Sequence, residues 1–220
     1  MKKMALCLAL LFGCSTAYAG VIIGGTRVIF EGGQKESSLS VNNPDTSPYL
    51  IQSWVENSGS GKPPFIITPP LFRLDGQQQN ILRILNDGSN LAADRESLYW
   101  INIKSIPSKA TDKDNVLQVA IKTRIKLIYR PRALKDKRPE DMAEQLRWTR
   151  SGSQLQVNNP TPYYMNFYAI DVGGQRIKDP QWVAPFATKT YALKGAVSGS
   201  VTWKLISDFG ASGNAHHAQL

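Results

Sequence analysis

The residue types that most often perform catalysis or bind metals are scarce in this chain. Its 220 residues include two histidines, His216 and His217, and two cysteines, Cys7 and Cys14. The histidines stand together near the C-terminus with no carboxylate or cysteine at ligand spacing, so a solvated tail is favoured over a metal site. No histidine is left for a catalytic triad within the body of the chain.

Acid catalysis is the remaining enzymatic alternative. Glu96, which stands close to Asp94, is a candidate general acid, but a lone acid pair before a strand is more often structural. No glycine-rich loop joins a strand to a helix, as phosphate binding requires. The sequence therefore predicts no enzyme, no cofactor and no metal. An unspecified carboxylate-dependent hydrolase is the weakest of the alternatives that stay open.

The first nineteen residues have the pattern of a signal peptide. Lys2 and Lys3 form a positive n-region, a short apolar stretch follows, and residues 17–19 fit a small-x-small cleavage site. We therefore expect residues 1–19 to be removed on export, so that the mature chain begins at Gly20.

Composition then limits what the exported chain binds. Both cysteines lie in the leader, which excludes a disulfide scaffold and thiolate chemistry from the mature chain. Lipoprotein processing at Cys14 is the weaker alternative, because Phe12 is too bulky for that signal. Loss of two lysines from a net charge of +9 leaves +7, which favours acidic proteins or envelope surfaces over nucleic acid. The rest of the sequence contains no run of about eighteen apolar residues, so it predicts no membrane span.

The rest of the chain alternates short apolar-polar runs with turns rich in Gly, Asn and Pro. This texture is typical of an all-β sandwich. The predicted strands are 21–30, 37–41, 49–56, 65–68, 81–85, 98–103, 146–149, 154–157, 163–170, 188–193 and 200–206. Pro69 and Pro70 end one strand, and either of the peptide bonds before them is a candidate for cis.

A basic, proline-punctuated connector divides the chain into two domains. The connector runs from Arg130 to Pro139, and a short helix is expected over 139–145, with Pro at its start and acids in its first turn. We place an N-terminal domain at 20–138 and a smaller C-terminal domain at 139–220. The tail after Gly210 is expected to be frayed.

One predicted strand, from Val116 to Tyr129, is far longer than the usual five or six residues. One of its faces is apolar at six of seven positions, and the other carries four cations. The two faces are Leu117, Val119, Ile121, Thr123, Ile125, Leu127 and Tyr129, and Gln118, Ala120, Lys122, Arg124, Lys126, Ile128 and Arg130. Part of this strand is expected to cover its own domain and part to extend past it.

Nine stretches, in order along the mature chain, together resemble the PapD-like periplasmic pilus chaperones. They are 25–30, 49–57, 67–72, 94–100, 106–108, 115–121, 124–131, 159–164 and 207–210. The resemblance implies two immunoglobulin-like domains set at an angle around a cleft. It also implies a periplasmic chaperone that lends a strand to an unfinished pilus subunit, which is donor-strand complementation, and presents the subunit to an outer-membrane usher.

The resemblance also assigns roles to particular residues. Leu117, Val119 and Ile121 match the donor residues, although alternation alone would favour ordinary core packing for them. Arg27 and Lys126 match two cleft cations that anchor the subunit's terminal carboxylate.

A second matched set, Arg83, Glu96 and Asp208, implies charged residues that hold the interdomain angle. The short, cysteine-free segment between Ile106 and Leu117 resembles the short-loop subgroup, which includes type 1 pilus chaperones. A self-capping homodimer stays open. The alternative to a chaperone is an exported immunoglobulin-like adhesion module, which would bury the apolar face completely.

Overall fold

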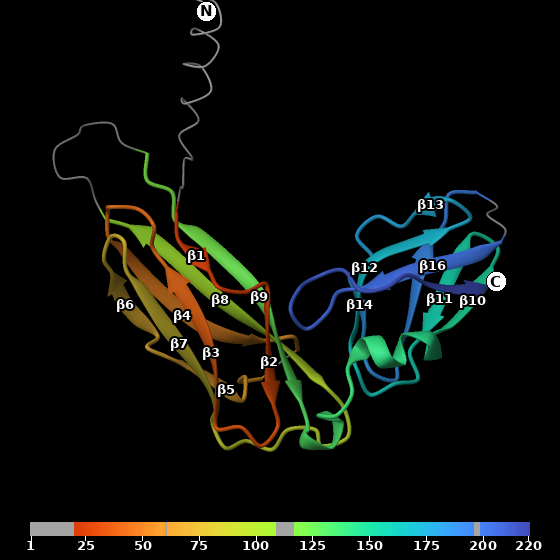
Figure 1. The fold of residues 1–220 in the computed structure, drawn as a ribbon, viewed down its shortest axis with the longest axis horizontal. Helices are drawn as coiled ribbons and strands as arrows, with labels where there is room; N and C mark the ends of the chain where they lie inside the picture. The colour runs from red at the N-terminus through yellow and green to blue at the C-terminus, as the bar shows by residue number, and fades with distance from the viewer. Residues whose placement is uncertain (1–19, 60, 109–116, 196–198) are drawn as a thin grey trace, which may run out of the picture.

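The computed structural model describes residues 20–59, 61–108, 117–195 and 199–220. The chain forms two β-rich lobes that meet at an elbow and diverge from it (Figure 1). The predicted leader and Val116 lie outside the described residues. No helix in the described part is long and apolar enough to cross a membrane.

The N-terminal lobe is a sandwich of two sheets. The first has the order β1-β3-β7-β5, with β1 (Ile22–Ile23), β3 (Glu36–Asn42), β7 (Gln79–Asn86) and β5 (Phe65–Thr68). The second has the order β2-β9-β8-β4-β6, with β2 (Arg27–Glu31), β9 (Ile121–Arg130), β8 (Ser97–Pro107), β4 (Tyr49–Asn57) and β6 (Leu71–Leu74). Alternate side chains from both sheets, such as Val41, Ile51, Leu82 and Ile101, fill the core between them.

The predicted single strand 21–30 is wrong, because the chain changes sheets partway along it. β1 pairs antiparallel with β3, whereas β2 pairs parallel with β9 in the opposite sheet. Glycine suits the crossing, because a Cβ at Gly24 would lie 1.9 Å from the Ser40 hydroxyl oxygen and would force that side chain to turn away. This switch brings Arg27 next to β9.

The predicted strand from Val116 to Tyr129 is also wrong at residues 117–120. Ladder pairing between β8 and β9 begins at Ser105 with Ile121, and residues 117–120 have no strand conformation. Residues 117–120 precede β9 outside the ladder, and the Gln118 side chain donates to the Ser108 carbonyl just beyond the end of β8 at 2.9 Å. Strand β6 was not predicted, and the peptide bond between Thr68 and Pro69 is cis.

The C-terminal lobe is a second, smaller sandwich, so the predicted all-β fold with two domains is confirmed. One sheet has the order β10-β11-β15, and the other β13-β12-β16-β17 with β14 also paired to β12. The strands are β10 (Arg147–Ser151), β11 (Gln154–Asn158), β15 (Thr188–Ala192), β13 (Gln175–Arg176), β12 (Met165–Val172), β14 (Trp182–Val183), β16 (Ser200–Leu205) and β17 (His216–Gln219). Trp148, Phe167 and Trp203 pack together in its core.

The prediction of a frayed, solvated tail is wrong. β17 pairs antiparallel with β16, and the His216 ring stacks on Trp203 with centroids 5.7 Å apart. His216 Nε2 lies 3.1 Å from a Glu140 carboxylate oxygen, whereas the adjacent His217 is exposed. The tail is ordered because β16 offers a sheet edge and Glu140 offers a polar partner.

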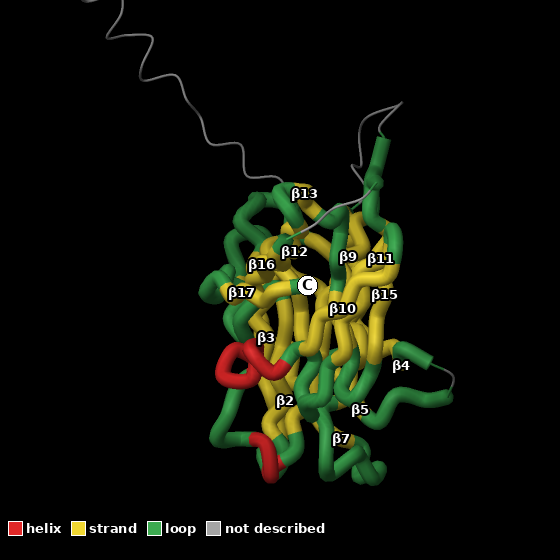
Figure 2. Tube along the Cα trace, turned by 90° about the vertical axis from the view of Figure 1, so that its right-hand side faces the viewer, coloured by secondary structure: helices red, strands yellow, loops and turns green. Residues whose placement is uncertain are grey.

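The elbow contains the two short helices of the described chain (red in Figure 2), η1 (Arg132–Leu134) and η2 (Pro139–Gln145). The helix expected at 139–145 is present as a 3₁₀ helix. Its start is stabilised by the Arg138 amide, which donates to the Asp141 carboxylate at 2.8 Å.

Candidate functional site

Arg27 and Lys126, the predicted cleft cations, are direct neighbours. They are Cα partners in the parallel pairing of β2 with β9. Residues paired in this way project from the same face of a sheet, and here it is the face opposite Val28 and Leu127 of the core. The two positive side chains therefore project side by side from the sheet, at the junction with the C-terminal lobe.

Lys126 is held by side chains of the other lobe. Its ammonium donates to the Asn166 side-chain oxygen at 2.5 Å and lies 4.3 Å from the centroid of the Trp182 ring. Burial lowers the pKa of Lys126 to about 8; the charges of Arg27 and Lys189 act in the same direction, and Asp179 opposes them.

Arg27 has unused hydrogen-bonding capacity. One terminal nitrogen donates to the Ile206 carbonyl at 3.5 Å, while its buried Nε has no partner in the described structure. Burial lowers the pKa of Arg27, and nearby Asp208 partly offsets this. Neither Arg27 nor Lys126 forms an ion pair with a carboxylate of the described residues. Two adjacent, partly buried cations that have no direct ion pair among the described residues favour an incoming anion such as a carboxylate.

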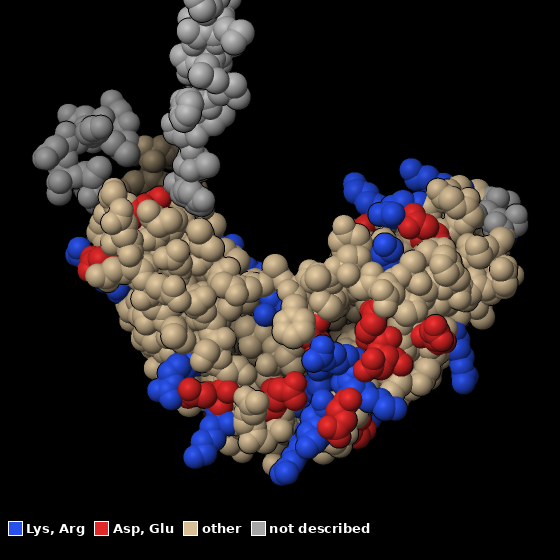
Figure 3. Space-filling model, viewed as in Figure 1, with Lys and Arg blue, Asp and Glu red and all other residues tan. Residues whose placement is uncertain are grey.

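An open hollow separates the two lobes (Figure 3). Because Lys126 and Arg27 project from the N-terminal sheet and contact Asn166 and Ile206 of the C-terminal lobe, both cations lie where the lobes meet. The structure thus brings together the two cations that the resemblance assigned to a cleft.

The predicted donor residues lie at the start of β9 and just before it. Leu117, Val119 and Ile121 expose 88%, 61% and 52% of their surface. Isolated exposed apolar side chains are ordinary, but three at alternate positions, two of them on unpaired residues that precede a strand, form a ready-made edge for another chain. We refer to residues 117–121 as the free segment.

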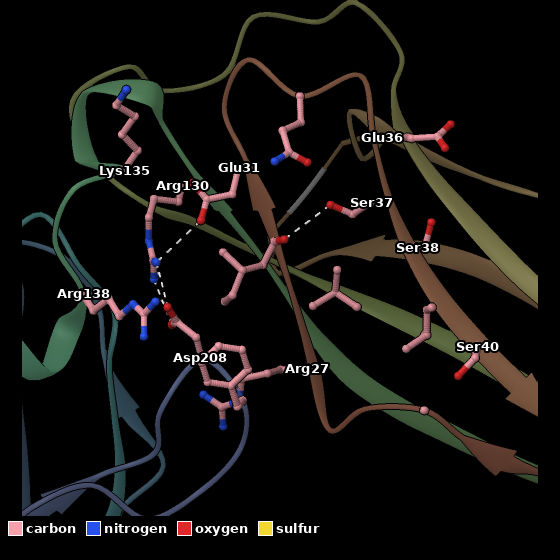
Figure 4. Close-up of a pocket in the computed structure, with 16 residues that line it drawn as sticks. Arg27, Glu31, Glu36, Ser37, Ser38, Ser40, Arg130, Lys135, Arg138 and Asp208 are labelled. Carbon is pink, nitrogen blue, oxygen red and sulfur yellow. Dashed lines mark hydrogen bonds and ion pairs between the residues drawn. The ribbon is translucent and has the colours of Figure 1, made fainter.

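A buried charged cluster joins the lobes a short distance along β9. The Arg130 guanidinium donates to Glu96 at 2.8 Å and to both carboxylate oxygens of Asp208 at 2.8 and 2.9 Å. Its contacts with Asp208 and with Glu31 are visible in Figure 4. Glu96 also accepts from the Tyr164 amide at 2.7 Å. Burial raises the pKa of Glu96 to about 7, an effect that the attraction of Arg130 only partly offsets.

Arg83 does not belong to this cluster, and the expectation that it does is wrong. It lies on the exposed face of β7 and pairs with Glu36 of β3, within the N-terminal lobe. Arg130, which is only 2% exposed, is the cation that joins the two lobes in place of Arg83. A signal for Arg130 was present in the sequence, because it follows Lys126 by four residues and so shares its face of the strand.

Asn166 and Trp182 are further residues that sequence reasoning missed. Nothing in their local pattern distinguishes an amide on a core strand or an aromatic residue after Pro180 from ordinary packing. Their placement against Lys126 depends on how the lobes meet. No cluster of three or more His, Cys, Asp or Glu residues in the described ranges is arranged to hold a metal ion.

Two family models match the chain, one for each lobe. Residues 20–135 match the model described as "Pili and flagellar-assembly chaperone, PapD N-terminal domain". Residues 141–217 match "Pili assembly chaperone PapD, C-terminal domain". The gap between the two matches falls in the elbow.

Individual relatives are similar over nearly their whole length. The probable fimbrial chaperone LpfB of Escherichia coli O157:H7 is 45% identical over 217 residues, which cover 96% of this chain and 93% of the relative. Chaperone protein FimC of Escherichia coli K12 is 46% identical over 200 residues, which cover 89% of this chain and 82% of the relative. The solved structure of the Salmonella enterica SafA pilin in complex with the SafB chaperone matches with a TM-score of 0.85 and 41% identity, over 94% of this chain and 99% of that chain.

Proposed function

The chain belongs to the PapD family of pilus-assembly chaperones, and we propose that it captures pilus subunits by lending them the free segment as a missing strand. The exposure of Ile121 at the start of β9, and of Leu117 and Val119 on the unpaired residues before it, carries this proposal. A subunit that lacks a strand exposes an apolar groove and unpaired backbone groups. An added strand supplies ladder hydrogen bonds, while its alternate side chains fill the groove.

The cleft cations give the added strand its register. The subunit's C-terminal carboxylate binds between Arg27 and Lys126, which lie side by side and lack an acidic partner of their own in the described structure. Because the free segment leads directly into β9, which contains Lys126, the spacing between the groove and the carboxylate is set by one continuous stretch of chain. A subunit therefore docks in a single alignment.

The cellular setting follows from the same assignment. Residues 1–19 direct export to the periplasm, the N-terminal domain spans 20–138, and the C-terminal domain spans 139–220. The chaperone acts without catalysis and delivers its subunits to an outer-membrane usher. The apolar free segment is also a surface that a second copy of the chain would cover when no subunit is bound.

An exported adhesion module is the competing function, and exposure of the free segment disfavours it. Such a module would bury the apolar face of its last strand in its own core, as Ile125 and Leu127 of β9 are buried here. Leu117 and Val119 are instead left uncovered by the described residues.

Co-expression with a pilus subunit that lacks its final strand tests the proposal. We expect the wild-type chain to co-purify with the subunit and Val119→Asp to lose it, because a charge would enter an apolar groove. Ile81→Asp is the matched control, since Ile81 is similarly exposed but lies on the outer face of β7. Undiminished capture by Val119→Asp would show that the free segment is not the donor.

A further inference from the structure

The C-terminal lobe contacts both cleft cations through two residues that are bonded to each other. Lys126 donates to the Asn166 side chain, and Arg27 donates to the Ile206 carbonyl. The Ile206 amide donates in turn to the Asn166 carbonyl at 2.7 Å. One short network of the C-terminal lobe therefore holds two side chains of the N-terminal lobe.

Asn166 is oriented by its own surroundings rather than by Lys126. It is 2% exposed, and its side-chain nitrogen donates to the Tyr164 carbonyl at 3.3 Å. That contact turns the amide oxygen toward the Lys126 ammonium. The strand β12, which carries Asn166, is fixed by pairing with both β14 and β16.

The ring of Trp182 is the second contact of the Lys126 ammonium, after the Asn166 oxygen. Trp182 is the Cα partner of Asn166 in the pairing of β14 with β12. Its ring packs against Trp100 of the N-terminal lobe at 5.7 Å in an edge-on geometry. The Lys189 ammonium donates to the Trp182 carbonyl at 3.2 Å and so fixes its backbone. A cation 4.3 Å from an aromatic centroid is attracted to the face of the ring.

We propose that Asn166 and Trp182 are positioning residues, which hold the Lys126 ammonium in place before a subunit arrives. A free lysine side chain samples many rotamers, and ordering it on binding weakens affinity. In this chain Asn166 and Trp182 already order the Lys126 side chain in the free protein. The subunit's carboxylate therefore binds a preorganised cation. The inference rests on the proposed function for its consequence, but the placement of Lys126 is a property of the free chain.

Substitutions at Asn166 separate this role from simple structural support. Asn166→Leu keeps the branched shape of the side chain and removes the acceptor that favours the charged ammonium, so the pKa of Lys126 falls. Asn166→Asp adds a negative charge, so the pKa of Lys126 rises. The other charged groups that act on Lys126, namely Arg27, Lys189 and Asp179, are unchanged in both variants.

Subunit capture is expected to weaken in both variants. In Asn166→Leu the ammonium loses its orientation, and in Asn166→Asp the new carboxylate occupies it and repels the subunit's carboxylate. A loss of about tenfold or more is expected at neutral pH, the size for one hydrogen bond to a charged group. Trp182→Phe retains an aromatic face and should capture better than Trp182→Leu.

The experiment combines NMR titration of ¹³C-methylated lysines in the free protein with subunit-capture assays. Lys126→Ala identifies the Lys126 resonance. Opposite shifts in its pKa in Asn166→Leu and Asn166→Asp, with weaker capture in both, support the proposal. A misfolded variant would instead give the ordinary lysine pKa of about 10.4 in either case.

Unchanged titration and unchanged capture in Asn166→Leu overturn the positioning role. Opposite shifts together with full capture by Lys126→Ala would support the placement of the ammonium by Asn166 and refute the anchoring step of the proposed function. The two failures are therefore distinguishable.

Discussion

Arg130 of β9 and Asp208 of the C-terminal lobe are joined by two hydrogen bonds, 2.8 and 2.9 Å long, from both terminal nitrogens of the guanidinium. Arg130 stands four residues after Lys126 on the same face of the same strand. One strand therefore fixes the junction of the lobes at its end, positions the anchoring ammonium in its middle and leads into the free segment at its start. Lobe angle and subunit register are set by the same element.

Removal of the Arg130 side chain should destabilise the protein strongly. Arg130→Ala leaves Glu96 and Asp208 without their shared cation, and breaking a buried ion pair from one side costs about 3–5 kcal/mol of unfolding free energy. Chemical denaturation measures the change. Arg83→Ala is the matched control, because its pair with Glu36 is exposed and its loss should leave stability near that of the wild type. Equal effects of the two substitutions would contradict the assignment of the cluster.

Lys126→Ala should abolish subunit capture while the fold remains intact. The substitution removes one of two charged donors for the terminal carboxylate, and Lys126 lies outside both hydrophobic cores. Pull-down of a subunit lacking its last strand measures capture, and circular dichroism reports the fold. Lys62→Ala, at a lysine whose side chain is 80% exposed in a distant loop, should capture normally. Full capture by Lys126→Ala would contradict the anchoring role.

The pairing of Arg27 with Lys126 shows where sequence reasoning reaches its limit. Alternation is imposed locally by the extended backbone, so it correctly placed Ile125 and Leu127 on one face and Lys126 on the other. The glycine crossing at Gly24, which brings β2 beside β9, leaves no periodic signal. Only the family resemblance placed the two cations together before the structure did.

The misassignment of Arg83 has a related cause. A charged residue at an outward strand position is equally compatible with an exposed pair and with an interdomain contact, and local sequence does not distinguish them. The outcome depends on which sheet faces the other lobe. β7 lies in the same sheet as β3, so Arg83 forms an ion pair with Glu36 of β3. β9 lies in the other sheet, which contacts the C-terminal lobe. The prediction of a strand at residues 117–120 was wrong for a different reason. A strand requires backbone hydrogen bonds to a neighbouring strand as well as an alternating sequence pattern.

Capture should weaken as pH rises through about 8. An ordinary lysine stays charged to about pH 10.4, but the pKa of Lys126 is lowered to about 8, so the anchor is neutralised over a range where the subunit carboxylate stays ionised. Binding isotherms between pH 6 and pH 10 measure this loss. Lys126→Arg is the control, since its guanidinium keeps its charge and its capture should vary little over the range.

Stability of the free protein should change with pH in the opposite direction. Because the folded state lowers the pKa of Lys126, the unfolded chain binds this proton more tightly, and the contribution of Lys126 to stability rises between about pH 8 and pH 10. Denaturation of wild type and Lys126→Met across this range isolates the contribution. Capture and stability that fall together above pH 8 would indicate general unfolding and contradict titration of the anchor.

The ordered tail provides a test of the C-terminal lobe alone. His216 is the one histidine whose ring is packed, with a side chain 10% exposed between Trp203 and Glu140. His216→Ala removes an aromatic contact and a hydrogen bond, and should cost about 1–3 kcal/mol of unfolding free energy. Loss of the stacked ring should also change the fluorescence of Trp203. His217→Ala is the matched control, because His217 is the next residue on the same strand and its exposed ring is hydrogen-bonded only to the Thr202 hydroxyl, at 2.9 Å, within the described chain. If the two alanine variants are equally stable, β17 does not hold the lobe together and the frayed tail predicted from composition is the better description.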